Sequence, residues 1–110
     1  MSRFDLLIES AKDRAKWLSN WMEVGARIKE IAKKYYPDCK TIVFGSIVEN
    51  KYSINSDIDI LVIRELGNSD EKIRVEVLRA LPKAPVELHF ATHDQFNRWY
   101  RRFIDAQIEL

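Results

Sequence analysis

Apolar residues recur every three or four positions through the first part of the chain, which is the spacing of helices that bury one face. The pattern predicts two helices, at about 3–18 and 20–36, although one long helix would satisfy the same spacing. Pro37 and Asp38 end the second helix, because a helix rarely continues through the residue before a proline. The first apolar stripe, expected to face the core, consists of Phe4, Leu7, Ile8, Ala11, Ala15, Leu18 and Met22.

Three short runs have the composition of strands. Residues 40–44 and 57–63 are rich in Ile, Val and Leu, as in strands that are buried on both faces. Residues 86–91 alternate between apolar and polar side chains, which indicates a strand with one more polar face. The sequence therefore predicts a small sheet.

Helical spacing returns after each of the last two predicted strands. It predicts a helix at 70–81 and a final helix at 93–106, and a short helix is expected at 46–50. The apolar side chains expected to face inward from the two longer helices are Ile73, Val75, Val77, Leu78, Leu81, Phe96, Trp99, Tyr100 and Phe103.

Two aspartates at the start of the second strand carry the strongest chemical signal. Asp57 and Asp59 are two residues apart, so in a strand their side chains project from the same face. Neighbouring carboxylates repel each other, and apolar surroundings worsen the repulsion. A positive group is therefore expected beside them. Lys or Arg could supply it, but the simplest partner is a hard divalent cation such as Mg²⁺.

Gly45 and Ser46 directly follow the first predicted strand. Glycine lets the backbone pass close to a ligand. Ser46 offers a hydroxyl and an amide at a predicted helix start, where phosphate binds readily. If Ser46 and Asp57 contact one ligand, the end of the first strand lies beside the start of the second, and the two strands are antiparallel.

A third acid extends this argument to the last predicted strand. Glu87 lies near the start of 86–91, as Asp57 and Asp59 do in their own strand. A ligand shared by all three would make the second and third strands parallel. The predicted helix at 70–81 is then the crossover that parallel strands require. The sequence thus predicts an α+β domain in which helices pack on one small mixed sheet.

Length and composition are those of a single domain. The 110 residues, of which 46% are hydrophobic, suffice for one core. The expected domain covers 1–110, with helices in 1–36, the sheet region in 40–91 and the final helix at 93–106. A formal net charge of +1 argues against binding of nucleic acid through overall charge.

The number of cysteines and the hydropathy of the chain indicate the cellular compartment in which the protein is expected. Cys39 is the only cysteine, which excludes an intramolecular disulfide and favours a small packed residue. No apolar run approaches membrane-spanning length, and acidic residues occur throughout the first part of the chain. Neither membrane association nor a signal peptide is therefore expected, and the predicted location is the cytoplasm.

Gly45-Ser46, ten intervening residues and Asp57-x-Asp59 resemble the signature of the DNA polymerase beta-like nucleotidyltransferase superfamily. The pattern is most similar to its minimal nucleotidyltransferase branch, whose short members are often encoded beside a HEPN-domain protein. One departure is Asn50, because members of the family usually carry glycine there. Asparagine tolerates left-handed backbone geometry better than most residues, so the turn is expected to be kept.

The resemblance implies a metal-dependent enzyme that moves a nucleoside monophosphate from a nucleoside triphosphate, AMP from ATP, with loss of pyrophosphate. It implies two Mg²⁺ ions, with Mn²⁺ as an alternative. The implied catalytic residues, which are also the implied metal ligands, are Asp57, Asp59 and Glu87. The implied nucleotide-binding residues are Gly45, Ser46 and Ser56.

The acceptor implied by the resemblance is a tyrosine of a HEPN toxin, which would make the protein an antitoxin. The chain has little length for an acceptor-binding domain, so a protein partner or a second copy of the chain would supply that surface. Two alternatives stay open. One is a transferase for small molecules, similar to aminoglycoside nucleotidyltransferases, and the other is a non-catalytic module that neutralises a toxin by contact alone.

Two further features have structural as well as functional explanations. His89 is expected on the same strand face as Glu87, but such histidines are more often packed or exposed than catalytic. Arg98, Arg101 and Arg102 form a dense basic cluster. Such a cluster is typical of a solvated helix face, and alternatively it could contact a phosphate or an acidic partner.

Overall fold

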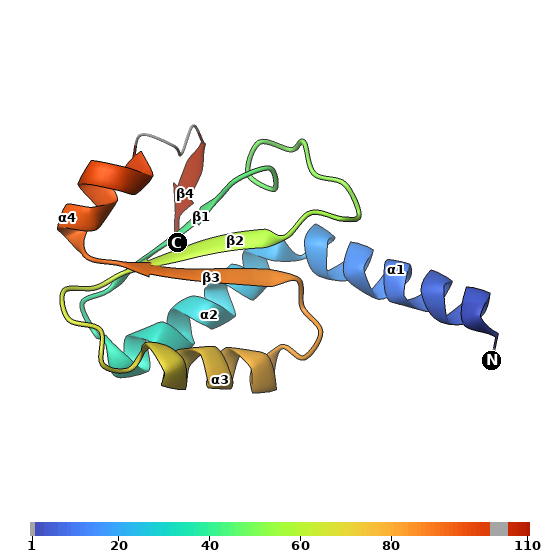
Figure 1. The fold of residues 1–110 in the computed structure, drawn as a ribbon, viewed down its shortest axis with the longest axis horizontal. Helices are drawn as coiled ribbons and strands as arrows, with labels where there is room; N and C mark the ends of the chain where they lie inside the picture. The colour runs from blue at the N-terminus through green and yellow to red at the C-terminus, as the bar shows by residue number, and fades with distance from the viewer. Residues whose placement is uncertain (1, 102–105) are drawn as a thin grey trace.

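The centre of the protein is a four-stranded mixed sheet (Figure 1) in the computed structural model, which describes residues 2–101 and 106–110. The strands lie in the order β3-β2-β1-β4. β1 and β2 are antiparallel while β2 and β3 are parallel, which confirms the predicted α+β arrangement. The strand bounds are Lys40–Phe44 for β1, Ile58–Ile63 for β2, Val86–Ala91 for β3 and Gln107–Glu109 for β4.

β4 is absent from the sequence-based predictions. It pairs antiparallel with β1, from Ile42 opposite Glu109 to Phe44 opposite Gln107. All three residues of β4 are exposed, so the segment lacks the alternation of buried and exposed side chains that signals a strand. Its backbone pairing with β1 therefore completes the sheet without a sequence pattern of its own.

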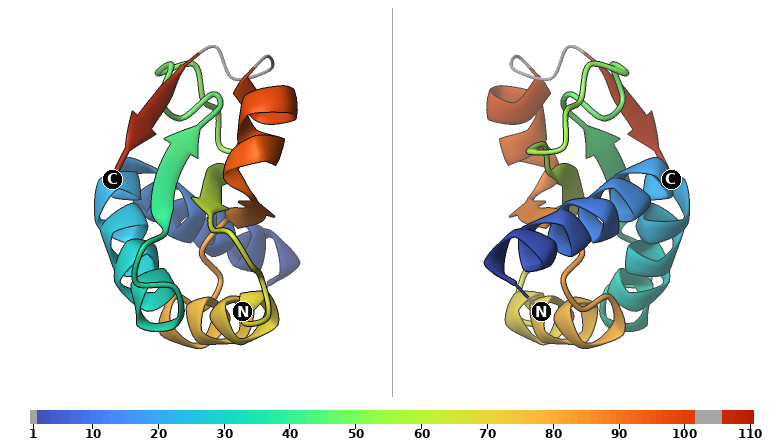
Figure 2. Two further views of the ribbon diagram at one scale, coloured as in Figure 1. Left: turned by 90° about the vertical axis from the view of Figure 1, so that its left-hand side faces the viewer. Right: turned by 90° about the vertical axis from the view of Figure 1, so that its right-hand side faces the viewer.

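Three regular helices precede the C-terminal region. α1 (Arg3–Ser19) and α2 (Trp21–Tyr35) confirm the prediction of two helices rather than one, with the break at Asn20. α3 (Asp70–Ala80) joins β2 to β3, as a parallel pair requires. α2 and α3 cover the same face of the sheet (Figures 1 and 2).

Each face of the sheet buries a different apolar set. Toward α2 and α3, the side chains of Ile58, Ile60 and Val62 are fully buried, and Cys39 joins this core as predicted. Burial of one such aliphatic side chain stabilises the fold by about 1.5–3 kcal/mol. On the opposite face a smaller cluster comprises Ile42, Phe44, Leu61, Ile63, Ala91, Phe96 and Tyr100.

The predicted inward face of α3 is only partly correct. Ile73, Val77 and Leu81, each four residues from the next, are buried. Val75 and Leu78 were expected to face inward but are 44% and 69% exposed. The prediction is wrong for these two because they lie outside the narrow helical stripe defined by residues four apart.

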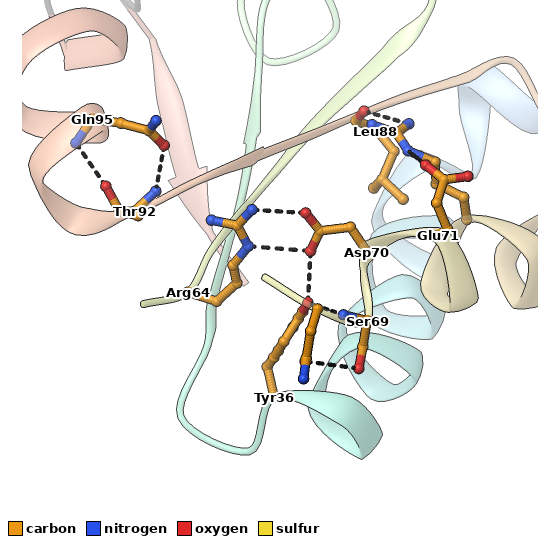
Figure 3. A network of polar contacts seen from close by, with 10 residues as sticks. Tyr36, Arg64, Ser69, Asp70, Glu71, Leu88, Thr92 and Gln95 are labelled. Atoms are coloured by element: carbon orange, nitrogen blue, oxygen red, sulfur yellow. Dashed lines mark hydrogen bonds and ion pairs between the residues drawn. The ribbon is translucent and has the colours of Figure 1, made fainter. Parts of the chain in front are cut away.

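The C-terminal helix is less regular than the predicted one. A short α4 (His93–Gln95) continues into η1 (Phe96–Tyr100), a stretch of π-helix. Thr92 and Gln95 form a reciprocal cap, in which each side chain accepts a hydrogen bond from the other's backbone amide (Figure 3). Phe96 and Tyr100 pack on the sheet as predicted. The predicted inward packing of Trp99 and Phe103, and the predicted helix at 102–105, lie outside what the structure describes.

The predicted short helix at 46–50 is wrong, because this segment forms turns. The Gly45 carbonyl accepts hydrogen bonds from the amides of Val48 and Glu49, at 3.2 and 3.4 Å. Asn50 has a φ of 57°, which confirms its predicted left-handed geometry. Left-handed geometry at Asn50 ends a helical turn, so the connection between β1 and β2 begins with turns instead of a regular helix.

α1 does not bury the apolar stripe that its sequence predicts. Leu18 is buried at its C-terminal end, but Phe4 and Leu7 are 69% and 62% exposed. Figure 1 shows the N-terminal part of α1 extending away from the sheet. No described part of the chain therefore covers most of the apolar side of this helix. Neither α1 nor any other described helix is long and apolar enough to cross a membrane.

A polar network ties the end of α2 to the connection between β2 and α3 (Figure 3). Arg64 donates two hydrogen bonds to the Asp70 carboxylate, at 3.1 and 2.7 Å, and the Tyr36 hydroxyl donates a third at 2.7 Å. Burial, the largest single influence, would raise the pKa of Asp70, but these donors together lower it below its ordinary value. The network fixes the C-terminal end of β2, the end opposite Asp57 and Asp59.

Candidate active site

The parallel pairing of β2 with β3 brings three potential metal ligands together. Asp59 lies opposite Glu87 in the strand register, and His89 follows two residues later on the same face as Glu87. One ligand atom from each of the three residues lies within 4.8 Å of the other two. The group lies on the sheet face that carries α4 and η1, where His89 approaches Tyr100.

The His89 imidazole is close to both carboxylates. Its Nε2 lies 3.8 Å from Oδ1 of Asp59 and 3.8 Å from Oε1 of Glu87. The ring also packs near Phe44 and Tyr100, at centroid distances of 5.5 and 6.4 Å. The sequence left His89 open between a packed and a catalytic residue. Its two-residue spacing from Glu87 correctly predicted that it lies on the same strand face as that acid.

Gly45 allows the turn after β1 to approach Asp59 closely. Its φ is +86°, a conformation that residues with a side chain rarely adopt. A Cβ atom at this position would lie 2.7 Å from Oδ2 of Asp59, well inside van der Waals contact. Glycine at position 45 therefore lets the turn lie against Asp59, an acid of the site. A larger residue there would displace either the turn or the Asp59 carboxylate.

Asp57 lies directly before β2, and its carboxylate contacts Arg14 of α1 instead of the group formed by Asp59, Glu87 and His89. Nη2 of Arg14 donates to Oδ1 of Asp57 at 2.8 Å. The expectation that a positive group accompanies the aspartates is thus met at Asp57 by an arginine. Sequence reasoning missed Arg14, since the two residues are 43 positions apart.

The two predicted nucleotide-binding serines occupy different surroundings. Ser46 is partly buried at the start of the turn after β1, and its carbonyl accepts a hydrogen bond from the Lys51 amide at 3.0 Å. The Ser56 hydroxyl accepts from the Ser53 amide at 2.9 Å, so it helps to shape the loop before β2. Nucleotide binding by Ser46 and Ser56 remains a prediction.

The donor set suits a hard divalent cation. Carboxylate oxygens are the preferred protein ligands of Mg²⁺ and Mn²⁺, and imidazole is a further ligand that Mn²⁺ accepts. Asp59 and Glu87 already lie close enough to share one ion. Asp57 would complete the predicted set of three carboxylates if its side chain turned away from Arg14. The residues present therefore fit such an ion.

The basic cluster is only partly described. Nε of Arg98 donates to Oδ1 of Asp94, one helical turn earlier, at 3.1 Å, and both side chains are well exposed. Arg101 is exposed as well, while Arg102 lies outside the described residues. For Arg98 this geometry favours the explanation that the cluster is part of a solvated helix face over contact with a phosphate or an acidic partner.

The observed mixed sheet, with acids on adjacent parallel strands and a glycine turn beside them, agrees with the resemblance to nucleotidyltransferases noted in the sequence. A family model, the nucleotidyltransferase domain, matches residues 26–107, and the chain belongs to this family. The match includes β1, β2 and β3, ends at the first residue of β4 and leaves out α1.

One solved structure agrees with this assignment. This crystal structure, of a protein provisionally described as a nucleotidyltransferase, is 31% identical and superimposes with a TM-score of 0.58. That match covers 77% of this chain and 95% of the other. A second protein, provisionally described as a nucleotidyltransferase from Sulfolobus solfataricus, is 19% identical with a TM-score of 0.49, covering 91% of this chain and 85% of its own. Among curated proteins, none matches the chain.

Proposed function

We propose that this protein transfers AMP from ATP to a hydroxyl group of a protein partner, in a reaction that requires Mg²⁺ or Mn²⁺. The observation that carries the proposal is the grouping of Asp59, Glu87 and His89 next to the Gly45 turn, in a chain of the nucleotidyltransferase family. In this proposal Asp57, Asp59 and Glu87 hold two divalent ions.

The reaction exchanges one phosphorus–oxygen bond for another. The acceptor hydroxyl oxygen bonds to the α-phosphorus of ATP, and the bond from that phosphorus to the bridging oxygen breaks to release pyrophosphate. Divalent ions, when bound, would neutralise charge on the triphosphate and lower the pKa of the attacking hydroxyl. Chemistry of this kind depends on positioning and charge neutralisation more than on covalent catalysis.

The chain's own residues would divide this task. Gly45, Ser46 and Ser56 are proposed to hold the nucleotide near the acids. The acceptor hydroxyl must lose a proton, and the 3.8 Å distance from His89 to each of two carboxylates supports a role for its imidazole as the proton acceptor. Of these groups, Asp59, Glu87 and His89 lie within reach of one another, and Gly45 lies beside Asp59.

The surface supports a protein rather than a small molecule as the acceptor. Phe4 and Leu7 of α1 are more than half exposed and Ile8 is 38% exposed, at the spacing of one helix face. Exposed apolar residues at helical spacing are typical of surfaces that bind other proteins. The proposed partner is a HEPN-domain toxin in the cytoplasm whose tyrosine receives AMP, so that this protein would act as its antitoxin.

Transfer of label from ATP tests the proposal. We would incubate the protein with Mg²⁺, ATP labelled in the α-phosphate and the product of the neighbouring gene, and locate the label by mass spectrometry. We expect AMP on a tyrosine of the partner. The label should be lost with Asp57→Ala/Asp59→Ala, because this variant lacks two of the three proposed metal ligands, and retained with Asp38→Ala, which alters an exposed turn far along the chain from the acids.

Two other outcomes would each favour an alternative. A tight complex without label, together with equal toxin neutralisation by Asp57→Ala/Asp59→Ala, would indicate a non-catalytic binding module. Label on a small molecule of a cell extract, with none on the partner, would indicate a small-molecule nucleotidyltransferase.

A further inference from the structure

Arg14 of α1 reaches the segment that leads into β2 and binds it at four points. Its guanidinium donates to the backbone carbonyl oxygens of Ile54 at 2.5 Å, Asn55 at 3.3 Å and Ser56 at 2.7 Å. The fourth acceptor is Oδ1 of Asp57 at 2.8 Å. A planar guanidinium with five donors is suited to such a multiple contact, whereas a lysine ammonium is not.

This contact lies outside the part of the chain that the family model matches. The family match begins at residue 26, whereas Arg14 belongs to α1, which projects from the body of the protein (Figure 1). The N-terminal helix therefore adds to the edge of the site a contact that the matched part of the chain does not contain.

The contact also determines where the Asp57 carboxylate points. Asp59, Glu87 and His89 offer ligand atoms within 4.8 Å of one another, and Asp57 is not in that group. Its Oδ1 is instead engaged by Arg14. A cation held against a carboxylate competes with any second cation for the same oxygens, and its charge also repels a dication bound nearby.

We propose that Arg14 is a positioning residue that holds Asp57 out of the metal site, so that a divalent ion must compete with Arg14 for this carboxylate. The inference rests on the proposed function, in which Asp57 is a metal ligand. The side chains of Arg14 and Asp57 are 32% and 47% exposed, so the pair can separate without opening the core. Exposed ion pairs are weak enough to be exchanged for a metal bond.

Mn²⁺ affinity, measured on the protein without nucleotide, tests this competition. Titration followed by the electron paramagnetic resonance of free Mn²⁺ would compare wild type, Arg14→Gln and Arg3→Gln. Arg3 is an exposed arginine on the same helix, so its replacement makes the same change in net charge. We expect Arg14→Gln to bind Mn²⁺ roughly fivefold more tightly than Arg3→Gln, the size of effect that loss of an exposed ion pair supports.

Two further variants establish whether the effect passes through Asp57. In an Asp57→Asn background, Arg14→Gln should tighten binding much less than it does in wild type, since the contested carboxylate is gone and only the repulsion by the arginine charge is removed. Arg14→Lys retains the charge but not the fork of donors, and should give an intermediate affinity. Tightening that persists undiminished in the Asp57→Asn background would overturn the inference.

The outcomes separate this inference from the proposed function. If wild type binds Mn²⁺ and Arg14→Gln binds it no more tightly than Arg3→Gln, competition by Arg14 is wrong and the proposed function is unaffected. If Arg14→Gln binds more weakly, Arg14 supports the metal ligand instead of withholding it, which also overturns the inference. If neither wild type nor Arg14→Gln binds Mn²⁺, the proposed metal site itself is contradicted.

Discussion

Replacing Glu87 with glutamine is expected to lower the rate of nucleotidyl transfer at least about a hundredfold while leaving ATP binding largely intact. Glu87 lies opposite Asp59 in the register of β2 and β3, and its side chain is 58% exposed. Glutamine has nearly the same shape, so the fold should be kept and only the charge lost. In our proposal this charge supports activation of the acceptor hydroxyl, which matters for transfer more than for nucleotide binding.

The measurement is the rate of AMP transfer to the acceptor, together with calorimetric binding of ATP in Mg²⁺. Glu71→Gln is the matched control, because Glu71 is an exposed glutamate of α3 on the other side of the sheet. Near-normal transfer by Glu87→Gln would show that Glu87 has no role in the reaction. The parallel pairing of β2 with β3 would be unaffected by that result, since it rests on the observed strand register.

Gly45→Ala is expected to reduce transfer about a hundredfold, although the replaced residue contributes no side chain to the site. The added Cβ would lie 2.7 Å from Oδ2 of Asp59, so either this carboxylate or the turn must move. A displacement of about 1 Å in a positioned catalytic group is enough for a loss of this size. Alanine at this position would have to adopt the left-handed φ of +86°, which should also lower the free energy of unfolding by about 1–2 kcal/mol.

Gly25→Ala is the control, because it adds the same methyl group at a buried glycine outside the site. In α2 a Cβ at this position would come within 2.8 Å of the end of the Leu110 side chain, which can shift. We expect only Gly45→Ala to lose Mn²⁺ affinity and transfer. Equal Mn²⁺ binding by Gly45→Ala and Gly25→Ala would contradict the steric dependence of Asp59 on this turn.

The sheet topology was predictable because chemistry constrains strand direction. If Ser46, Asp57 and Glu87 serve one ligand, the first pair of strands must be antiparallel and the second parallel, and the observed pairing has these directions. Apolar runs alone would have located the strands without orienting them. Side-chain alternation likewise places His89 on the face of Glu87, since the two are two residues apart in one strand.

α1 illustrates what periodicity leaves open. The helical spacing of Phe4, Leu7 and Ile8 correctly predicts a helix with one apolar side. Whether another element covers that side depends on the packing of the whole chain, and the spacing of residues within one helix does not predict this packing. The same spacing describes a helix buried in the core of its own domain and one that binds another protein.

Contacts between distant segments account for the remaining differences. Nothing near Arg14 in the sequence distinguishes it from other arginines of an exposed helix, so its bond to Asp57 could not be predicted. β4 is equally inconspicuous, because its stability comes from pairing with β1 rather than from its own pattern. At 46–50 the structure has a turn where a short helix was predicted. The reason is local, because Asn50 has left-handed geometry, which the sequence did indicate.

The central claim is that the acids beside the Gly45 turn bind a divalent metal ion and, with it, a nucleoside triphosphate. Isothermal titration of ATP into wild type, Asp57→Asn/Asp59→Asn and the control Asp38→Asn, each with and without Mg²⁺, tests it most directly. We predict ATP binding by wild type and the control only when Mg²⁺ is present, and a loss of that binding in the double variant, because asparagine is a much weaker ligand for a hard cation than aspartate. Equal metal-dependent binding of ATP by wild type and the double variant would contradict the claim.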